Sequence, residues 1–144
     1  MKKITLALLI LFPIYSFTQE LEGYNQSCDW YIKAVQTQDL EERLQIVKDN
    51  FQEFESFDVN DPCRVLYCLS VKEKYYVLSR DSSVGFVYPK KMINISKFNE
   101  IDTVLLLNSK ATKVLYGDNI KGVVLISSDS DDYEKRIANL WKQK

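Results

Sequence analysis

Two short apolar runs near the C-terminal end constrain the fold of this chain more than any other feature of its sequence. The first is Val104–Leu107 and the second is Val123–Ile126, and each has the length of a buried strand. Between them lies a short helical pattern that ends at Gly117, where a left-handed backbone would stop the helix. Ile101–Ser127 is therefore predicted to form a strand, a short helix and a strand. A helix between neighbouring strands favours a parallel, right-handed βαβ crossover.

Aromatic and β-branched residues upstream of this stretch predict further strands. The expected strands cover 64–71, 74–80 and 84–88, and the turn residues Arg80–Ser83 separate the last two. Strands so close together in sequence favour an antiparallel meander. With the βαβ unit, the meander would form a small mixed sheet.

Helical patterns flank the predicted sheet on both sides. A short helix is expected over Asp29–Val35, and a second begins after Asp39, which stands three residues before Glu42 as in a capping box. Packing into the core is the first interpretation of the second helix, and binding to a partner helix is the alternative. Its apolar stripe consists of Leu40, Leu44, Val47, Phe51 and Phe54. A last helix is expected over 131–142, with Asp131 as its N-cap.

The predicted fold class is α+β, with helices at the N-terminus, a small mixed sheet and a C-terminal helix. We expect one domain over residues 19–144, with a helical part at 27–57, a sheet part at 64–127 and a C-terminal helix at 131–142. A length of 144 residues and a hydrophobic content of 46% suit one globular domain.

Residues 1–18 have the three-part pattern of a secretory signal peptide. Two lysines precede the apolar run Ile4–Phe12, and Ser16 and Thr18 place small residues before a cleavage site. The apolar run is too short to span a membrane. We therefore expect export to the periplasm or out of the cell, and no transmembrane segment in the mature chain.

The three cysteines of an exported chain are able to form a disulfide. Cys63 and Cys68 would lie about 16 Å apart on one strand. A disulfide needs Cα atoms within about 7 Å, so Cys28 would pair with Cys63 or with Cys68. The alternative is that all three cysteines are small buried apolar residues.

The composition excludes several classes of function. The chain has no histidine, which removes the commonest general base, the commonest zinc ligand and every nucleophile pair that uses histidine. Its net charge of −1 disfavours nucleic-acid binding. The acidic residues Asp129, Asp131 and Asp132 lack the pattern of a calcium-binding EF-hand loop and are interpreted as helix initiation. We therefore predict no catalytic, cofactor-binding or metal-binding residues.

A motif of small and aromatic residues runs through the central stretch. Its residues are Ala111, Thr112, Leu115, Tyr116, Gly117, Gly122 and Val123. At this spacing, Ile101–Ser127 resembles the end of the plug domain of TonB-dependent outer-membrane receptors of the Bacteroidetes type. The resemblance implies a plug-like architecture, in which glycine permits turns and tight packing. It implies no catalytic or ligand-binding residue.

The sequence also departs from the plug pattern. Asn108 and Ser109 stand where the family has Lys-Gly, and Lys121 stands where it usually has Asn. A receptor needs a long β-barrel after its plug, and no such strands follow here, so we expect no transport function.

The function expected from these features is that of an exported, non-enzymatic module that binds an envelope or periplasmic protein. The alternative is a periplasmic carrier of a small ligand. The tyrosines that would line the pocket of a carrier are Tyr67, Tyr75, Tyr76 and Tyr88. A third hypothesis is an enzyme that uses carboxylates such as Glu53, Glu55 or Asp58, although acids of this kind are common on solvated surfaces.

Overall fold

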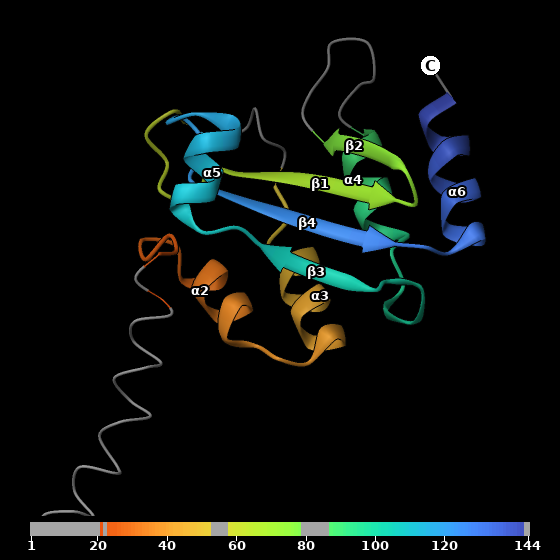
Figure 1. Cartoon of the computed structure of the whole chain (residues 1–144), viewed down its shortest axis with the longest axis horizontal. Coiled ribbons are helices and arrows are strands. Elements are labelled where there is room, and N and C mark those ends of the chain that lie inside the picture. Colours follow the sequence, from red (N-terminus) through yellow and green to blue (C-terminus); the bar gives the residue numbers. More distant parts are fainter. Residues whose placement is uncertain (1–20, 22, 53–57, 79–86, 143–144) are drawn as a thin grey trace, which may run out of the picture.

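The computed structural model describes residue 21 and residues 23–52, 58–78 and 87–142. Its described strands are β1 (Val65–Val71), β2 (Lys74–Leu78), β3 (Thr103–Leu106) and β4 (Gly122–Ser128). Its described helices are α2 (Asp29–Gln36), α3 (Leu40–Asp49), α4 (Val87–Asn94), the 3-10 turn η2 (Phe98–Glu100), α5 (Ser109–Tyr116) and α6 (Asp131–Lys142). The α+β fold class, with helices before and after the sheet, is confirmed (Figure 1).

The four strands form one mixed sheet in the order β2-β1-β4-β3. The central strands β1 and β4 are parallel, whereas β2 and β3 pair antiparallel with their neighbours. The predicted parallel crossover from β3 to β4 is therefore wrong. Figure 1 shows the reason: α5 lies at the end of the sheet where β3 ends and β4 begins, so the chain turns back instead of returning to the start of β3.

The predicted strand over 84–88 is also wrong where the structure describes it, because Val87 begins helix α4. Its residues 84–86 lie outside the described chain, as do residues 79 and 80 of the strand predicted to end there. The aromatic and β-branched residues Val87 and Tyr88 favour a strand locally. The helix instead buries Met92 and Ile93 in the core, and this tertiary packing outweighs local preference.

Several local predictions are confirmed. The helix expected at Asp29 is α2, and the Asp39 carboxylate caps α3 by accepting a hydrogen bond from the Glu42 backbone N–H at 2.8 Å. The cap of α6 is displaced by one residue. Ser130, not Asp131, precedes the helix, and its hydroxyl accepts from the Tyr133 N–H at 3.2 Å.

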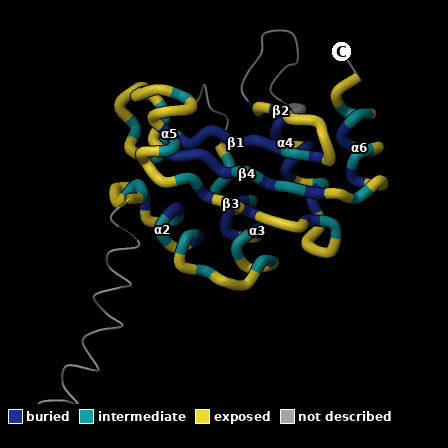
Figure 2. Tube along the Cα trace, viewed as in Figure 1, coloured by how far each residue is buried: buried dark blue, intermediate teal, exposed yellow. Residues whose placement is uncertain are grey.

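The main core lies on one face of the sheet. Because successive strand residues point to opposite faces, β1 directs Val65, Tyr67, Leu69 and Val71 toward this core. Side chains from α2, α3, α4 and α6 complete it. Figure 2 shows the buried centre of β1 and β4 between more exposed edges. Helix α3 is shorter than the predicted stripe, because it ends at Asp49: Phe51 follows the helix, and Phe54 lies outside the described residues. Leu44 and Val47 of the stripe are buried in this core, so core packing and not a partner helix accounts for these two residues.

A disulfide ties the start of α2 to the segment before β1. It joins Cys28 to Cys63, with their Cα atoms 5.2 Å apart, and this is one of the two pairings that the sequence left open. Cys68 is a buried free thiol on the other face of the sheet.

An ion pair between α6 and η2 should make stability depend on pH. Arg136 pairs with Glu100 and holds the pKa of that carboxyl below its usual value of 4.5. A lowered folded-state pKa gives stability that is complete above 4.5 and is lost as the pH falls through the folded value. Glu100→Gln should cost about 1 kcal/mol at pH 7, since the pair is only partly buried.

Urea unfolding at pH 7 and at pH 3 measures this effect. The difference between the wild-type chain and Glu100→Gln should shrink at pH 3. Glu73→Gln is the matched control, because Glu73 is exposed and forms no ion pair with a described residue. An equal Glu100→Gln effect at both pH values would contradict the assignment.

Candidate interaction surface

Among the residues that the structure describes, the face of the sheet opposite the main core is covered only at one end. There α5 packs over a small second cluster whose buried members are Leu66, Cys68 and Val123. In Figure 1, α5 lies over this end, whereas α4 lies behind the sheet. The remainder of the face carries no described helix.

A row of apolar side chains crosses all four strands on this less covered face. Strand register places Val77 beside Cys68, Cys68 beside Leu125, and Leu125 beside Leu105. The side chains of Val77 and Leu105 are 36% and 44% exposed, and Tyr75 on the same face of β2 is 52% exposed. We call Tyr75, Val77, Leu105 and Leu125 the open sheet face.

Helix α5 extends this apolar surface with two exposed side chains. They are Val114 and Leu115, which are 77% and 64% exposed. The buried residue of α5 is Thr112, and Tyr116 is half-buried one turn later. The i, i+4 pair Thr112 and Tyr116 therefore faces the sheet, because residues four apart lie on the same side of a helix.

Tyr116 joins α5 to the open sheet face. Its hydroxyl forms a hydrogen bond with the Tyr75 hydroxyl and lies 3.8 Å from the Cys68 sulfur. Burial raises the pKa of the Cys68 thiol and of both phenols, so all three groups are protonated at neutral pH. A buried, protonated thiol is a poor nucleophile. This cluster is therefore suited to packing α5 on the sheet.

The two glycines of the motif have different structural roles. Gly117 ends α5 with φ 83° and ψ −176°, a conformation that is essentially restricted to glycine. Gly122 opens β4 directly beneath α2, where an added Cβ would lie 2.8 Å from the ring of Tyr31. Asn108 caps α5 by accepting a hydrogen bond from the Ala111 N–H at 2.8 Å.

The tyrosines proposed for a carrier pocket do not come together. Tyr67 and Tyr76 are buried in the main core, whereas Tyr75 lies on the opposite face of the sheet. The side chain of Tyr88 lies outside the described part of the structure. The tyrosine pocket is therefore not formed by the three described side chains.

The acidic residues considered in the sequence have local roles where they are described. The Asp58 carboxylate accepts from the Asn60 N–H at 2.9 Å in a turn, and Glu53 and Glu55 lie outside the described residues. Asp131 pairs with Lys72, and Asp132 lies 4.0 Å from Lys135. Across the described ranges, no three acidic or cysteine side chains are grouped as a metal site would need.

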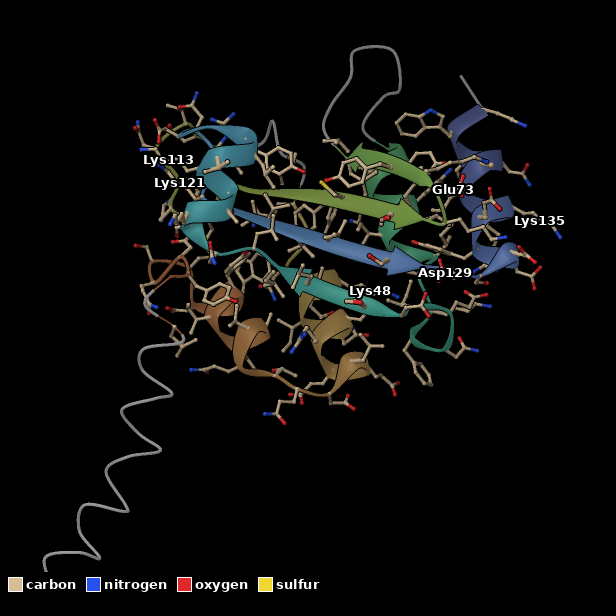
Figure 3. All side chains as sticks on the ribbon, viewed as in Figure 1. Lys48, Glu73, Lys113, Lys121, Asp129 and Lys135 are labelled. Carbon is tan, nitrogen blue, oxygen red and sulfur yellow. A yellow bond between two sulfur atoms is a disulfide. The ribbon has the colours of Figure 1, made fainter. Side chains whose placement is uncertain are left out.

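Charged residues lie at both ends of the sheet that carries the apolar surface. Figure 3 shows Lys113 and Lys121 beside α5, and Glu73, Asp129 and Lys135 at the opposite end of the sheet. An apolar centre with a polar rim is the usual anatomy of a protein–protein interface. The sequence did not predict this surface. Alternation along β2 indicates that Tyr75 and Val77 share one face of the strand, but it does not indicate which face of the sheet is covered.

No helix in the described part of the chain has the length and apolar character required to cross a membrane. The resemblance of Ile101–Ser127 to receptor plug domains remains a prediction. No protein-family model, no curated protein and no solved structure matches this chain.

Proposed function

We propose that this chain is an exported, non-enzymatic module that binds an envelope or periplasmic protein through the open sheet face and the outer side of α5. One observation carries the proposal. Of the eight large apolar side chains exposed among the described residues, five belong to this surface. They are Tyr75, Val77, Leu105, Val114 and Leu115. Apolar side chains gathered on one surface are the usual mark of a binding site.

Export is supported by the N-terminal pattern and by the Cys28–Cys63 disulfide. Disulfides persist in the periplasm and outside the cell and are rare in reducing compartments. The plug-like motif is the reason for proposing an envelope protein as the partner. Leu115 of that motif is exposed on α5, where a partner is able to reach it.

A matched pair of variants tests the proposed surface. The mature chain, beginning at Gln19, is crosslinked and recovered from periplasmic and membrane extracts of its source. The double variant Leu105→Asn, Leu115→Asn should retain at least about tenfold less partner, since truncating a central apolar contact costs about 1–2 kcal/mol. Val59→Asn is the control, because Val59 is 52% exposed but lies in the turn before β1.

Two results would contradict this proposal. The first is that no protein is retained by the wild-type chain under native or crosslinking conditions. The second is that the double variant and the Val59→Asn control retain the same proteins in equal amounts.

A further inference from the structure

A polar groove, separate from the open sheet face, lies between α3 and the segment that joins α4 to η2. Its volume is about 300 Å³, at the lower end of the range for small-molecule sites. Helix α3 contributes Gln45 and Lys48 to its lining, and the facing segment contributes Asn94, Phe98 and Asn99.

Two hydrogen bonds hold Lys48 and Ser96 of the groove lining in place. The Lys48 ammonium donates to the backbone carbonyl of Ser96, which is fully buried. The Ser96 hydroxyl lies 2.5 Å from the Tyr133 hydroxyl of α6. An ammonium group has three N–H donors, and within the described ranges Lys48 uses only this one. Lys48 therefore brings a positioned cation with unused donors to the lining of the groove.

The amides of the groove are available to a ligand. Within the described chain, the side-chain amides of Asn94 and Asn99 have no hydrogen-bond partner. Each amide offers two N–H donors and a carbonyl acceptor, which match the neighbouring hydroxyl groups of a sugar. Gln45 donates to Asp49 at 2.7 Å, and this bond leaves its own carbonyl oxygen without an assigned donor.

An aromatic ring and a second lysine complete the site. Phe98 is 52% exposed at the groove, so its ring presents an apolar surface on which the C–H face of a sugar is able to pack. Lys97 also lines the groove, and Glu41 is its only acidic residue. Two ammonium groups and one carboxylate give the lining a net charge of about +1, which favours a ligand with a single negative charge.

We propose that this groove binds a small sugar acid of the uronic acid class. The ligand carboxylate pairs with Lys48 and Lys97, its hydroxyls bond to Asn94 and Asn99, and its ring packs on Phe98. This site does not depend on the partner surface proposed above, because it is built from other residues.

A titration of the labelled mature chain, followed by two-dimensional NMR, tests the proposal. The probes are glucuronate, galacturonate, glucose, acetate and inorganic phosphate. We expect the uronates to bind with a Kd of about 1 mM or tighter, and at least about tenfold more tightly than glucose or acetate. The backbone signals of residues 45–48 and 94–99 should shift.

Variants separate the contributions of charge and ring. Lys48→Met and Lys97→Met should each weaken uronate binding about tenfold or more with little effect on weak glucose binding. Phe98→Ala should weaken the binding of both sugars. Lys110→Met is the control, since it removes the same charge from the exposed side of α5. If Lys48→Met unfolds the chain, Lys97→Met and Phe98→Ala carry the test, because both side chains are exposed.

Four results would overturn the proposal. The first is no shifts with about 50 mM uronate, roughly a fiftyfold excess over the expected Kd of about 1 mM. The second and third are acetate or phosphate binding as tightly as uronate, and glucose binding as tightly as uronate. The fourth is unchanged uronate binding by Lys97→Met and Phe98→Ala.

Discussion

Replacing Cys28 and Cys63 with serine should lower the free energy of unfolding by about 4 kcal/mol. The two cysteines are 35 residues apart, and cross-linking a loop of this length removes conformational entropy from the unfolded chain. Cys28 is also fully buried at the start of α2, so a serine hydroxyl there would lose its hydration. A loss of this size is a large part of the stability of an ordinary domain.

Urea unfolding of the wild-type chain, with and without dithiothreitol, measures this effect. Reduction should destabilise the wild-type chain by a similar amount and should have no further effect on the double serine variant. Mass spectrometry after alkylation should find one reactive thiol in the unfolded, unreduced chain, from Cys68. A loss below about 1 kcal/mol would show that the disulfide does not restrict the unfolded chain as proposed.

Gly122→Ala should be the second strongly destabilising change, with a cost of about 3 kcal/mol. The added methyl group would lie 2.8 Å from the Cε2 and Cζ atoms of Tyr31, a buried residue of α2. The Tyr31 ring cannot move freely, because its hydroxyl donates to the Leu107 carbonyl at 2.7 Å and lies 3.0 Å from the Val123 carbonyl. Relief of the clash would therefore break buried hydrogen bonds.

Two further variants show whether the same contact is responsible. Tyr31→Phe alone should cost about 2 kcal/mol, since it leaves buried backbone groups without a partner. Combined with Gly122→Ala, its additional cost should be smaller, because the displaced ring has already lost those bonds. Gly23→Ala is the control, with its nearest contact at an ordinary 3.4 Å. Strict additivity of the two changes would argue against this account.

The parts of the fold that depend on neighbours in sequence could be predicted. Asp39 caps the helix that follows it, as its spacing to Glu42 indicates. Gly117 ends α5 with a positive φ, as the sequence predicts. The strand at β1 was predicted from its aromatic and β-branched residues, and the structure places it within one residue of the expected start. These features form within one or two turns of chain, so their signals are local.

The candidate interaction surface could not be predicted in the same way. Val114 and Leu115 stand in an apolar pattern that indicates a packed side, yet the structure exposes them. Leu125 lies in a run typical of a strand buried on both faces, but it is only half-buried. The pattern records which side chains are apolar. It does not record whether another element is present to cover them.

By itself, the sequence determined the α+β class and several helix starts and stops, and it restricted any disulfide to Cys28 with Cys63 or Cys68. Only the tertiary structure decided that Cys63 is its partner, that β3 and β4 are antiparallel, and that 87–94 is a helix. The physical reason is the range of the interactions involved. Caps and turns are completed by neighbouring residues, whereas strand direction, disulfide choice and side-chain exposure depend on segments far apart in the chain.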